Sequence, residues 1–173
     1  EKILSLKPDI LFCTGLEQAV TVENLRRLGI RVVVSDPATM DELYASIMEI
    51  GALTGKEKAA GELTAGMQAR IGAVEARVEA VPADKRPRMF IEIWHDPLMT
   101  AGAGSIIDEF IRLAGGINVA ADINRPYTRI SIEQVIARDP ERMVLTYMDT
   151  PAAGVEKRPG WQGMTAVRVG AVY

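Results

Sequence analysis

Cysteine and histidine are almost absent from the 173-residue sequence, which contains one of each. An internal disulfide is therefore excluded, and a dedicated zinc or manganese site, which normally takes several His or Cys ligands, is disfavoured. Positive charge is not in excess, because 20 Lys and Arg stand against 23 Asp and Glu, so the basic surface typical of nucleic-acid binders is missing. No apolar run approaches the roughly 20 residues of a membrane span. What remains is an average globular composition, with 48% hydrophobic and 25% charged residues.

The beginning of the sequence predicts a βαβ unit, the building block of parallel sheets. An apolar run at 10–13 follows a proline turn, amphipathic helix spacing covers 17–28, and the β-branched run 31–35 predicts a buried strand. Strand, helix and strand with short joints indicate two parallel strands and their crossover.

The middle of the sequence predicts two helices, because no proline occurs from 38 to 81. Capping patterns at Thr39/Glu42 and Thr54/Glu57 predict where they begin. The second helix is expected to run about 25 residues, or roughly 37 Å, long enough to lie across a domain or to tie two lobes together.

The remainder of the sequence again alternates strands and helices. On the strand 88–94 we expect Phe90, Glu92 and Trp94 to share one face. The other expected elements are helices at 105–114, 131–138 and 161–165 and strands at 142–147 and 166–173, with loops at 95–104 and 118–130.

Two segments repeat each other at a fixed offset. Residues 1–14 (EKILSLKPDILFCT) align with residues 133–146 (EQVIARDPERMVLT), and each predicts a helix end, a proline turn and a buried strand. This repeat predicts two similar α/β lobes joined by the helices between them, and ligand sites favour such interfaces.

Side chains suited to ligand binding gather in the predicted loops. Aromatic faces stack on flat ligands, and Arg forks bind carboxylates. The candidates are Trp94, Met99, Tyr127, Arg129, Arg158 and Trp161. Their aromatic members could equally be core residues.

His95 and Cys13 are each open to two interpretations. His95, after a strand end, is either an exposed loop histidine or an axial ligand to a metal held in a macrocycle. Cys13 is a small core residue or the nucleophile of an α/β enzyme, in which His95 would act with either Cys13 or Asp96. Glu133 and Glu17 lie at the starts of predicted helices. There a carboxylate interacts favourably with the helix dipole, or it could dock a basic partner.

Four segments together resemble the helical-backbone substrate-binding proteins of ABC importers, of the vitamin B12 and ferric siderophore or haem receptor type. They are LRRLGIRVVV, IWHDPLMTAGAGSIIDEFIRLAGGINVA, SIEQVIARDPERMVL and RPGWQGMTAVRVGAVY. This resemblance implies two Rossmann-like lobes with parallel sheets, a long linker helix, and no catalysis. According to this resemblance, residues 1–54 form a partial N-terminal lobe, residues 55–82 form the linker, and residues 83–173 form a C-terminal lobe without its closing helix.

The same resemblance implies a function outside the cytoplasm. The protein would capture a bulky metal chelate, a corrinoid such as cobalamin first and a ferric siderophore or haem second, with no intrinsic cofactor. It would deliver the chelate to a membrane permease, with Glu133 and Glu17 at the docking positions, from the periplasm or as a surface lipoprotein. The ligand would contact Trp94, His95, Met99, Tyr127, Arg129, Arg158 and Cys13.

Two rival classes make different predictions. An enzyme requires the Cys13 thiol and His95 imidazole within hydrogen-bonding distance, near ~3 Å. An interaction module without a ligand requires a cleft filled by its own side chains. The expected truncation of the first lobe also predicts exposed sheet edges, which a second copy of the chain could cover.

Overall fold

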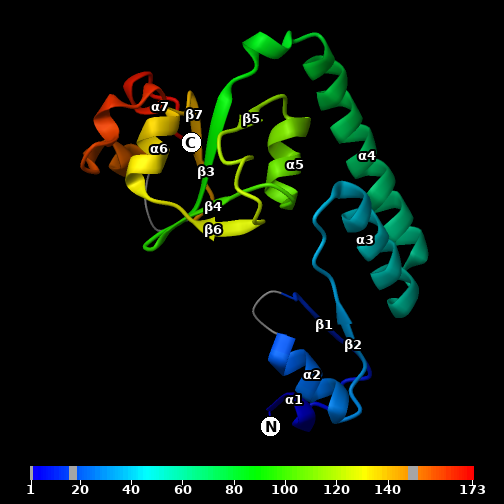
Figure 1. Ribbon diagram of the computed structural model, residues 1–173. Coiled ribbons are helices and arrows are strands. Elements are labelled where there is room, and N and C mark those ends of the chain that lie inside the picture. Colours follow the sequence, from blue (N-terminus) through cyan, green and yellow to red (C-terminus); the bar gives the residue numbers. More distant parts are fainter. Residues whose placement is uncertain (1, 16–18, 148–151) are drawn as a thin grey trace.

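The computed structural model describes residues 2–15, 19–147 and 152–173, and it has an α/β fold with two separate sheets (Figure 1). The smaller sheet belongs to an N-terminal segment, residues 2–15 and 19–35. The larger sheet belongs to a C-terminal body, residues 83–147 and 152–173. Between them along the chain lie the helices α3 (Met40–Thr54) and α4 (Glu57–Glu79).

The N-terminal segment confirms the predicted βαβ unit. Strands β1 (Leu11–Cys13) and β2 (Val32–Val34) pair in parallel, and α2 (Ala19–Arg27) is the crossover between them. Val22, Leu25 and Val32 form its small buried core. The short helix α1 (Lys2–Ser5) precedes β1.

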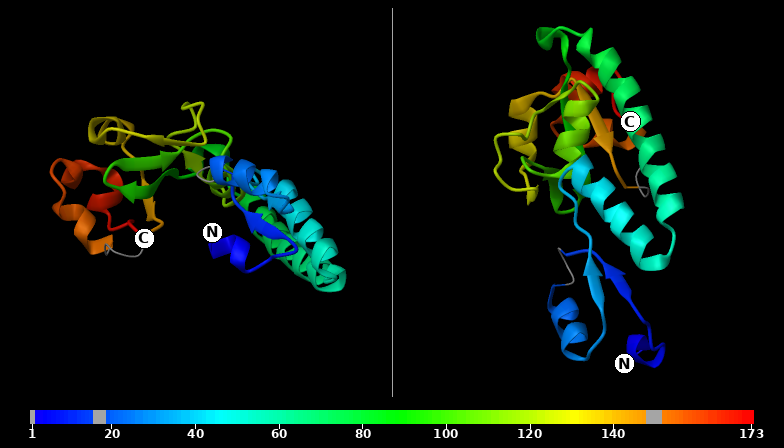
Figure 2. Two further views of the ribbon diagram at one scale, coloured as in Figure 1. Left: turned by 90° about the horizontal axis from the view of Figure 1, so that it is seen from below. Right: turned by 90° about the vertical axis from the view of Figure 1, so that its right-hand side faces the viewer.

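The helices α3 and α4 lie antiparallel and side by side in every view (Figure 2). Thr39 caps α3 as predicted, because its side chain accepts a hydrogen bond from the Glu42 amide. The predicted cap at Thr54 is wrong: Thr54 is the last residue of α3, its hydroxyl donates to the Ile50 carbonyl, and α4 begins after Lys56 without a side-chain cap.

The C-terminal body is built on a five-stranded sheet in the order β5-β3-β4-β6, with β7 on the other side of β3. Its strands are β3 (Arg88–His95), β4 (Leu98–Ala101), β5 (Ile117–Asn118), β6 (Tyr127–Arg129) and β7 (Arg142–Leu145). Its helices are α5 (Ile106–Leu113), α6 (Ile132–Arg138) and α7 (Thr165–Arg168), with 3-10 turns at Ala83–Lys85, Ala152–Lys157 and Trp161–Gly163.

The expectation of a purely parallel sheet is wrong for this body. Strands β5 and β7 run parallel to β3, but β4 and β6 are antiparallel to their neighbours. Strand β4 follows β3 after a two-residue turn, Asp96-Pro97, and so short a connection can only reverse the chain. Both β4 and β6 occupy stretches that were expected to be loops.

The expected last strand at 166–173 is also wrong. Residues 165–168 form α7, and only a single bridge joins Val172 to Met143 of β7. The Ala166 side chain is fully buried in the main core of the body. That core lies between the sheet and its helices and contains Phe90, Ile130, Val135, Met143, Val155, Trp161, Met164 and Ala166.

Candidate functional site

The carboxyl ends of the parallel strands in both sheets point into the space between the N-terminal segment and the C-terminal body (Figure 1). In open α/β sheets this is the edge at which ligands bind. A cavity of about 110 Å³ lies here, between the stretch that follows β2 and the C-terminal body. Its lining is Asp36, Pro37 and Ala38 after β2, and Gly104, Ser105, Ile106, Pro126 and Tyr127 from the body.

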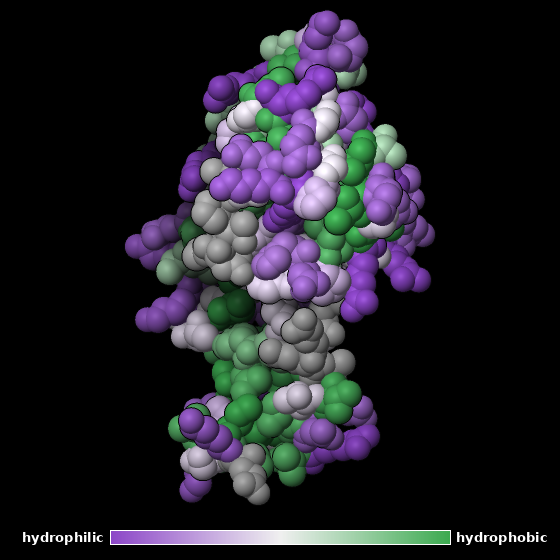
Figure 3. Space-filling view, turned by 90° about the vertical axis from the view of Figure 1, so that its left-hand side faces the viewer, coloured by the Kyte–Doolittle hydropathy of each residue, from purple (hydrophilic) through white to green (hydrophobic). Residues whose placement is uncertain are grey.

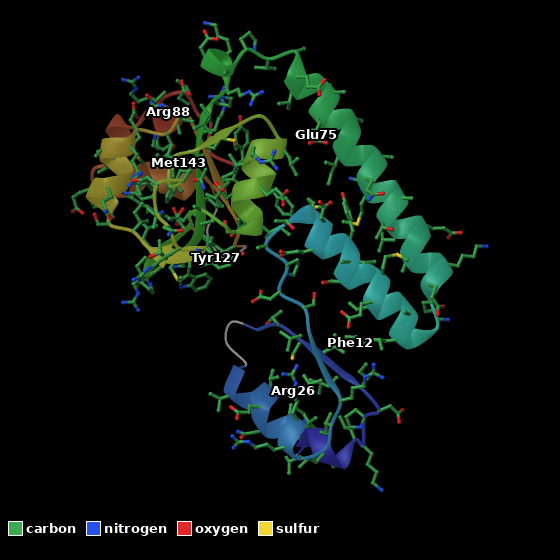
Figure 4. All side chains as sticks on the ribbon, turned by 45° about the vertical axis from the view of Figure 1, so that its right-hand side comes forward. Phe12, Arg26, Glu75, Arg88, Tyr127 and Met143 are labelled. Carbon is green, nitrogen blue, oxygen red and sulfur yellow. The ribbon has the colours of Figure 1, made fainter. Side chains whose placement is uncertain are left out.

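Tyr127 faces this space from the lower edge of the C-terminal body (Figure 4). Burial raises the pKa of its phenol, and the negative charge of Asp36 raises it further. The phenol is therefore neutral at physiological pH, and it can donate one hydrogen bond and offer a ring face to a ligand.

Strand register brings three of the predicted site residues into one row. Trp94 of β3 lies opposite Met99 of β4, and Met99 lies opposite Arg129 of β6. Directly opposed residues share a face of the sheet, and Tyr127, two residues before Arg129, lies on that same face. We call Tyr127, Arg129, Met99 and Trp94 the cleft row.

A β-bulge in β3 places Trp94 in this row. Glu92 pairs with Thr100, but Trp94 pairs with Met99, so the register shifts by one residue between them. Consecutive residues of β4 point to opposite faces, and Trp94 therefore leaves the face of Glu92. The expectation that these two side chains share a face is wrong for this reason.

Trp94, His95 and Tyr147 form an aromatic cluster at the end of the cleft row. The ring centroids are 5.0 Å apart for Trp94 and His95, 5.1 Å for His95 and Tyr147, and 5.8 Å for Trp94 and Tyr147. Trp94 is 42% exposed, and its indole N–H donates to the Asp96 carbonyl. An exposed indole held by this hydrogen bond offers a flat apolar face to a ligand.

Behind the cluster lies a buried ion pair that the sequence did not predict. Glu92 is completely buried, and both its carboxylate oxygens accept hydrogen bonds from Arg158, at 2.8 and 2.7 Å. The Tyr147 hydroxyl donates to the same carboxylate and accepts from Arg158 at 2.7 Å. Arg158 also lies over the Trp161 ring at 4.7 Å, and Trp161 is a core residue. Arg158 is thus engaged with Glu92, Tyr147 and Trp161, and its side chain is 22% exposed.

These interactions shift the pKa values of Tyr147 and Arg158. Burial and the hydrogen bond to Glu92 raise the pKa of Tyr147 to about 12. Burial acts to lower the pKa of Arg158, but its hydrogen bonds to Glu92 and Tyr147 outweigh this and raise it. The network therefore holds a carboxylate, a guanidinium and a neutral phenol.

Cys13 lies at the carboxyl end of β1, and its thiol contacts the Val33 carbonyl at 3.8 Å. The imidazole of His95 is held by Trp94 and Tyr147, and its buried Nδ1 has no hydrogen-bond partner among the described residues. The close approach of Cys13 and His95 that an enzyme would require is therefore not found.

The family model described as "Periplasmic binding protein" matches residues 1–173, the whole of the sequence. The chain belongs to the periplasmic binding protein family. This confirms the resemblance drawn from the sequence, and because the family is one of binding proteins, it confirms that the chain is not an enzyme.

Three similar proteins illustrate the family. YvrC of Bacillus subtilis, an uncharacterised ABC transporter substrate-binding lipoprotein, is 30% identical over 178 residues, which cover 100% of this chain and 56% of that protein. A cobalamin-binding protein of Halobacterium salinarum is 34% identical over 149 residues, covering 83% of this chain and 39% of that protein. The solved structure of an ABC-type Fe3+-hydroxamate transport system from Saccharomonospora viridis superimposes with a TM-score of 0.80 at 29% identity, covering 98% of this chain and 61% of that one. The chain thus spans about half the length of the curated relatives it matches.

The structure describes only one of the two carboxylates that the sequence predicted to dock a partner. Glu133 is exposed in the first turn of α6, where hydrogen bonds from Ser131 and from its own backbone amide lower its pKa. It is thus ionised and accessible at neutral pH. Glu17 lies outside the described residues.

Other hollows exist away from the cleft row. An apolar one of about 350 Å³ lies between α3, α4 and α5 and is lined by Met40, Leu43, Met67, Arg70, Ile71, Val74 and Phe110. It offers a single charged group to orient a ligand, whereas the cleft row and its cluster offer an indole, a phenol, an imidazole and a guanidinium.

The described residues contain neither a metal-binding cluster nor a membrane-spanning helix. Within residues 2–15, 19–147 and 152–173, no three His, Cys, Asp or Glu side chains gather closely enough to hold a metal ion. None of the helices there combines the length and the apolarity needed to cross a bilayer.

Proposed function

We propose that the chain is the ligand-binding part of an ABC importer's substrate-binding protein, and that it captures a bulky metal chelate between two lobes. The observation that carries the proposal is the cleft row with its aromatic cluster, which lies where the carboxyl ends of the strands of both sheets face one another. Flat, largely apolar chelates with polar rims need stacking faces and a few fixed donors, and this surface supplies both.

The proposed ligand is a corrinoid such as cobalamin first, and a ferric siderophore or haem second. The relative from Halobacterium salinarum supports the first choice and the ferric hydroxamate transport structure the second. Trp94, His95 and Met99 would contact the flat part of the chelate, and Tyr127 and Arg129 its polar groups. Cys13, from β1, would contact it from the opposite side, whereas Arg158 would act indirectly through Tyr147.

The proposed lobes are residues 1–54 and 83–173, and residues 55–82 are the linker. Helix α4, at 23 residues, is about 35 Å long and packs against α3 along part of its length and against α5 further on, which supports a stiff connection. We therefore expect only a small reorientation of the lobes when ligand binds.

Delivery to a membrane permease is the final part of the proposal. The exposed, ionised Glu133 would contact basic side chains of the permease, with Glu17 at the matching position of the other lobe. The family and the lipoprotein relative support a location in the periplasm or an anchor on the outer side of the membrane.

The test is a titration of the chain with cyanocobalamin, haemin and a ferric hydroxamate, followed by tryptophan fluorescence and calorimetry. We expect saturable quenching by one chelate, lost in the Trp94→Ala variant but kept in the Phe110→Ala variant, which alters the apolar hollow instead. If all three chelates leave both fluorescence and heat unchanged, the chelate proposal is wrong.

A further inference from the structure

We propose that Glu92 and Arg158 are positioning residues that hold Tyr147 in place as the support of the ligand-facing aromatic cluster. The inference rests on the proposed function, because it assigns a role within the same binding surface. It adds two side chains that lie behind that surface and a third, Tyr147, that links them to it.

The hydrogen bonds of the three side chains close a triangle. Arg158 donates to both oxygens of Glu92 and to the Tyr147 hydroxyl, and that hydroxyl donates to Glu92. With its oxygen fixed at two points, the phenol ring of Tyr147 keeps one orientation. The same ring touches both His95 and Trp94, so its orientation sets theirs.

Stability alone does not account for this arrangement. Burying a carboxylate and a guanidinium costs desolvation free energy, and apolar side chains of similar volume often stabilise such a site equally well or better. An apolar pair could not hold a phenol oxygen at two points. One guanidinium nitrogen of Arg158 contacts both oxygens of the completely buried Glu92, and the other donates to Tyr147, so the geometry points to orientation as the role of the pair.

The pair also connects the cluster to the rigid core of the body. Arg158 lies over Trp161, which is 1% exposed and packs in the main hydrophobic core. Glu92 is in the central strand β3, and its carbonyl accepts the Thr146 amide at the end of β7. A cluster anchored on two strands and the core does not need to be ordered when ligand arrives, which favours affinity.

The experiment uses the Tyr147→Phe variant first, because it removes only the hydroxyl and leaves the Glu92–Arg158 pair intact. Glu92→Gln and Arg158→Lys follow, and Asp122→Asn is the control, since it weakens another pair of Arg and carboxylate, Arg138–Asp122, outside the cluster. Iodide quenching in the absence of ligand reports on Trp94 alone, because the other tryptophan, Trp161, is buried.

In Tyr147→Phe the ring loses both hydrogen bonds that hold it, so we expect easier iodide quenching of Trp94 and about fivefold weaker binding of cyanocobalamin, with the melting temperature within a few degrees of the original. Asp122→Asn should change neither readout. Quenching that stays at the original value in Tyr147→Phe would overturn the positioning role. If no chelate binds the unaltered chain, the proposed function fails, but the ligand-free quenching still decides the positioning role.

Discussion

Tyr147 has the most strongly perturbed environment of the tyrosines in the described part of the chain. Its hydroxyl lies between the Glu92 carboxylate and the Arg158 guanidinium, and its ring is half-buried among other aromatic side chains. Burial disfavours the charged phenolate, and the hydrogen bond to Glu92 and the negative charge of Glu92 disfavour it further, so the pKa rises from 10.0 to about 12.

Tyr147 therefore predicts a loss of stability at alkaline pH. Below pH 10 the phenol is neutral in both the folded and the unfolded chain, and its contribution is fully present. Above pH 10 the unfolded chain loses the proton first, so folded stability falls as pH rises toward the folded pKa of about 12. Tyrosinate absorbance should show one of the four tyrosines ionising last, together with unfolding. The Tyr147→Phe variant should lack that step; if it keeps it, the assignment is wrong.

Individual candidate residues were predictable where the type of side chain alone suggests ligand binding. Aromatic and Arg side chains near the ends of predicted elements suggested Trp94, Tyr127 and Arg129, with Met99 nearby. The strand register brings these four residues together. Glu92 was missed as a buried partner, although a charged residue in the apolar run RMFIEIW is a usable signal. The partner Arg158 lies 66 residues away, and no local pattern reveals a pairing at that separation.

At the scale of elements, the contact between α3 and α4 depends on close backbone approach. Gly51 is buried in α3, and a Cβ built there would lie 2.5 Å from the Cβ of Ala60 in α4. Gly66, further along α4, has nothing within 4 Å of the corresponding position. One glycine is thus required by packing, and the other only weakens its helix.

These two glycines make opposite predictions. Gly66→Ala should raise the free energy of unfolding by about 0.5–1 kcal/mol through helix propensity. Gly51→Ala should lower it by about 1–3 kcal/mol, because the new methyl group would overlap Ala60. Denaturant titrations of both variants measure the difference. Two variants of equal stability would mean that α3 and α4 do not pack as described.

Elements were predictable where periodicity or repetition supports them. The two copies of the repeat are each a helix, a proline turn and a strand, as expected, in α1–β1 and α6–β7. The strands β4 and β6 were missed because they have only four and three residues, too few for alternation to show. Strand β4 pairs locally with β3 across the two-residue turn and at long range with β6, and these two antiparallel pairings turn the expected parallel sheet into a mixed one.

At the scale of the whole molecule, the N-terminal segment is the least covered part. Among the described residues its two strands pair only with each other, and the apolar face of the segment is open to solvent (Figure 3). Its exposed large hydrophobic residues are Ile3, Leu4, Leu6, Phe12, Val20, Leu28 and Val34. Unpaired strand edges with such a face are prone to associate, so pairing with a second copy stays a prediction.

The proposed mode of binding requires the ligand to contact both parts of the chain at once. The most direct measurement is hydrogen exchange of the chain with and without a saturating chelate, read segment by segment. We predict slower exchange at Asp36–Ala38, at Trp94–Met99 and at Tyr127–Arg129, with α4 unchanged because the linker does not bend. Protection confined to α3, α4 and α5 around Met67, Val74 and Phe110 would place the ligand in the apolar hollow instead and contradict the account.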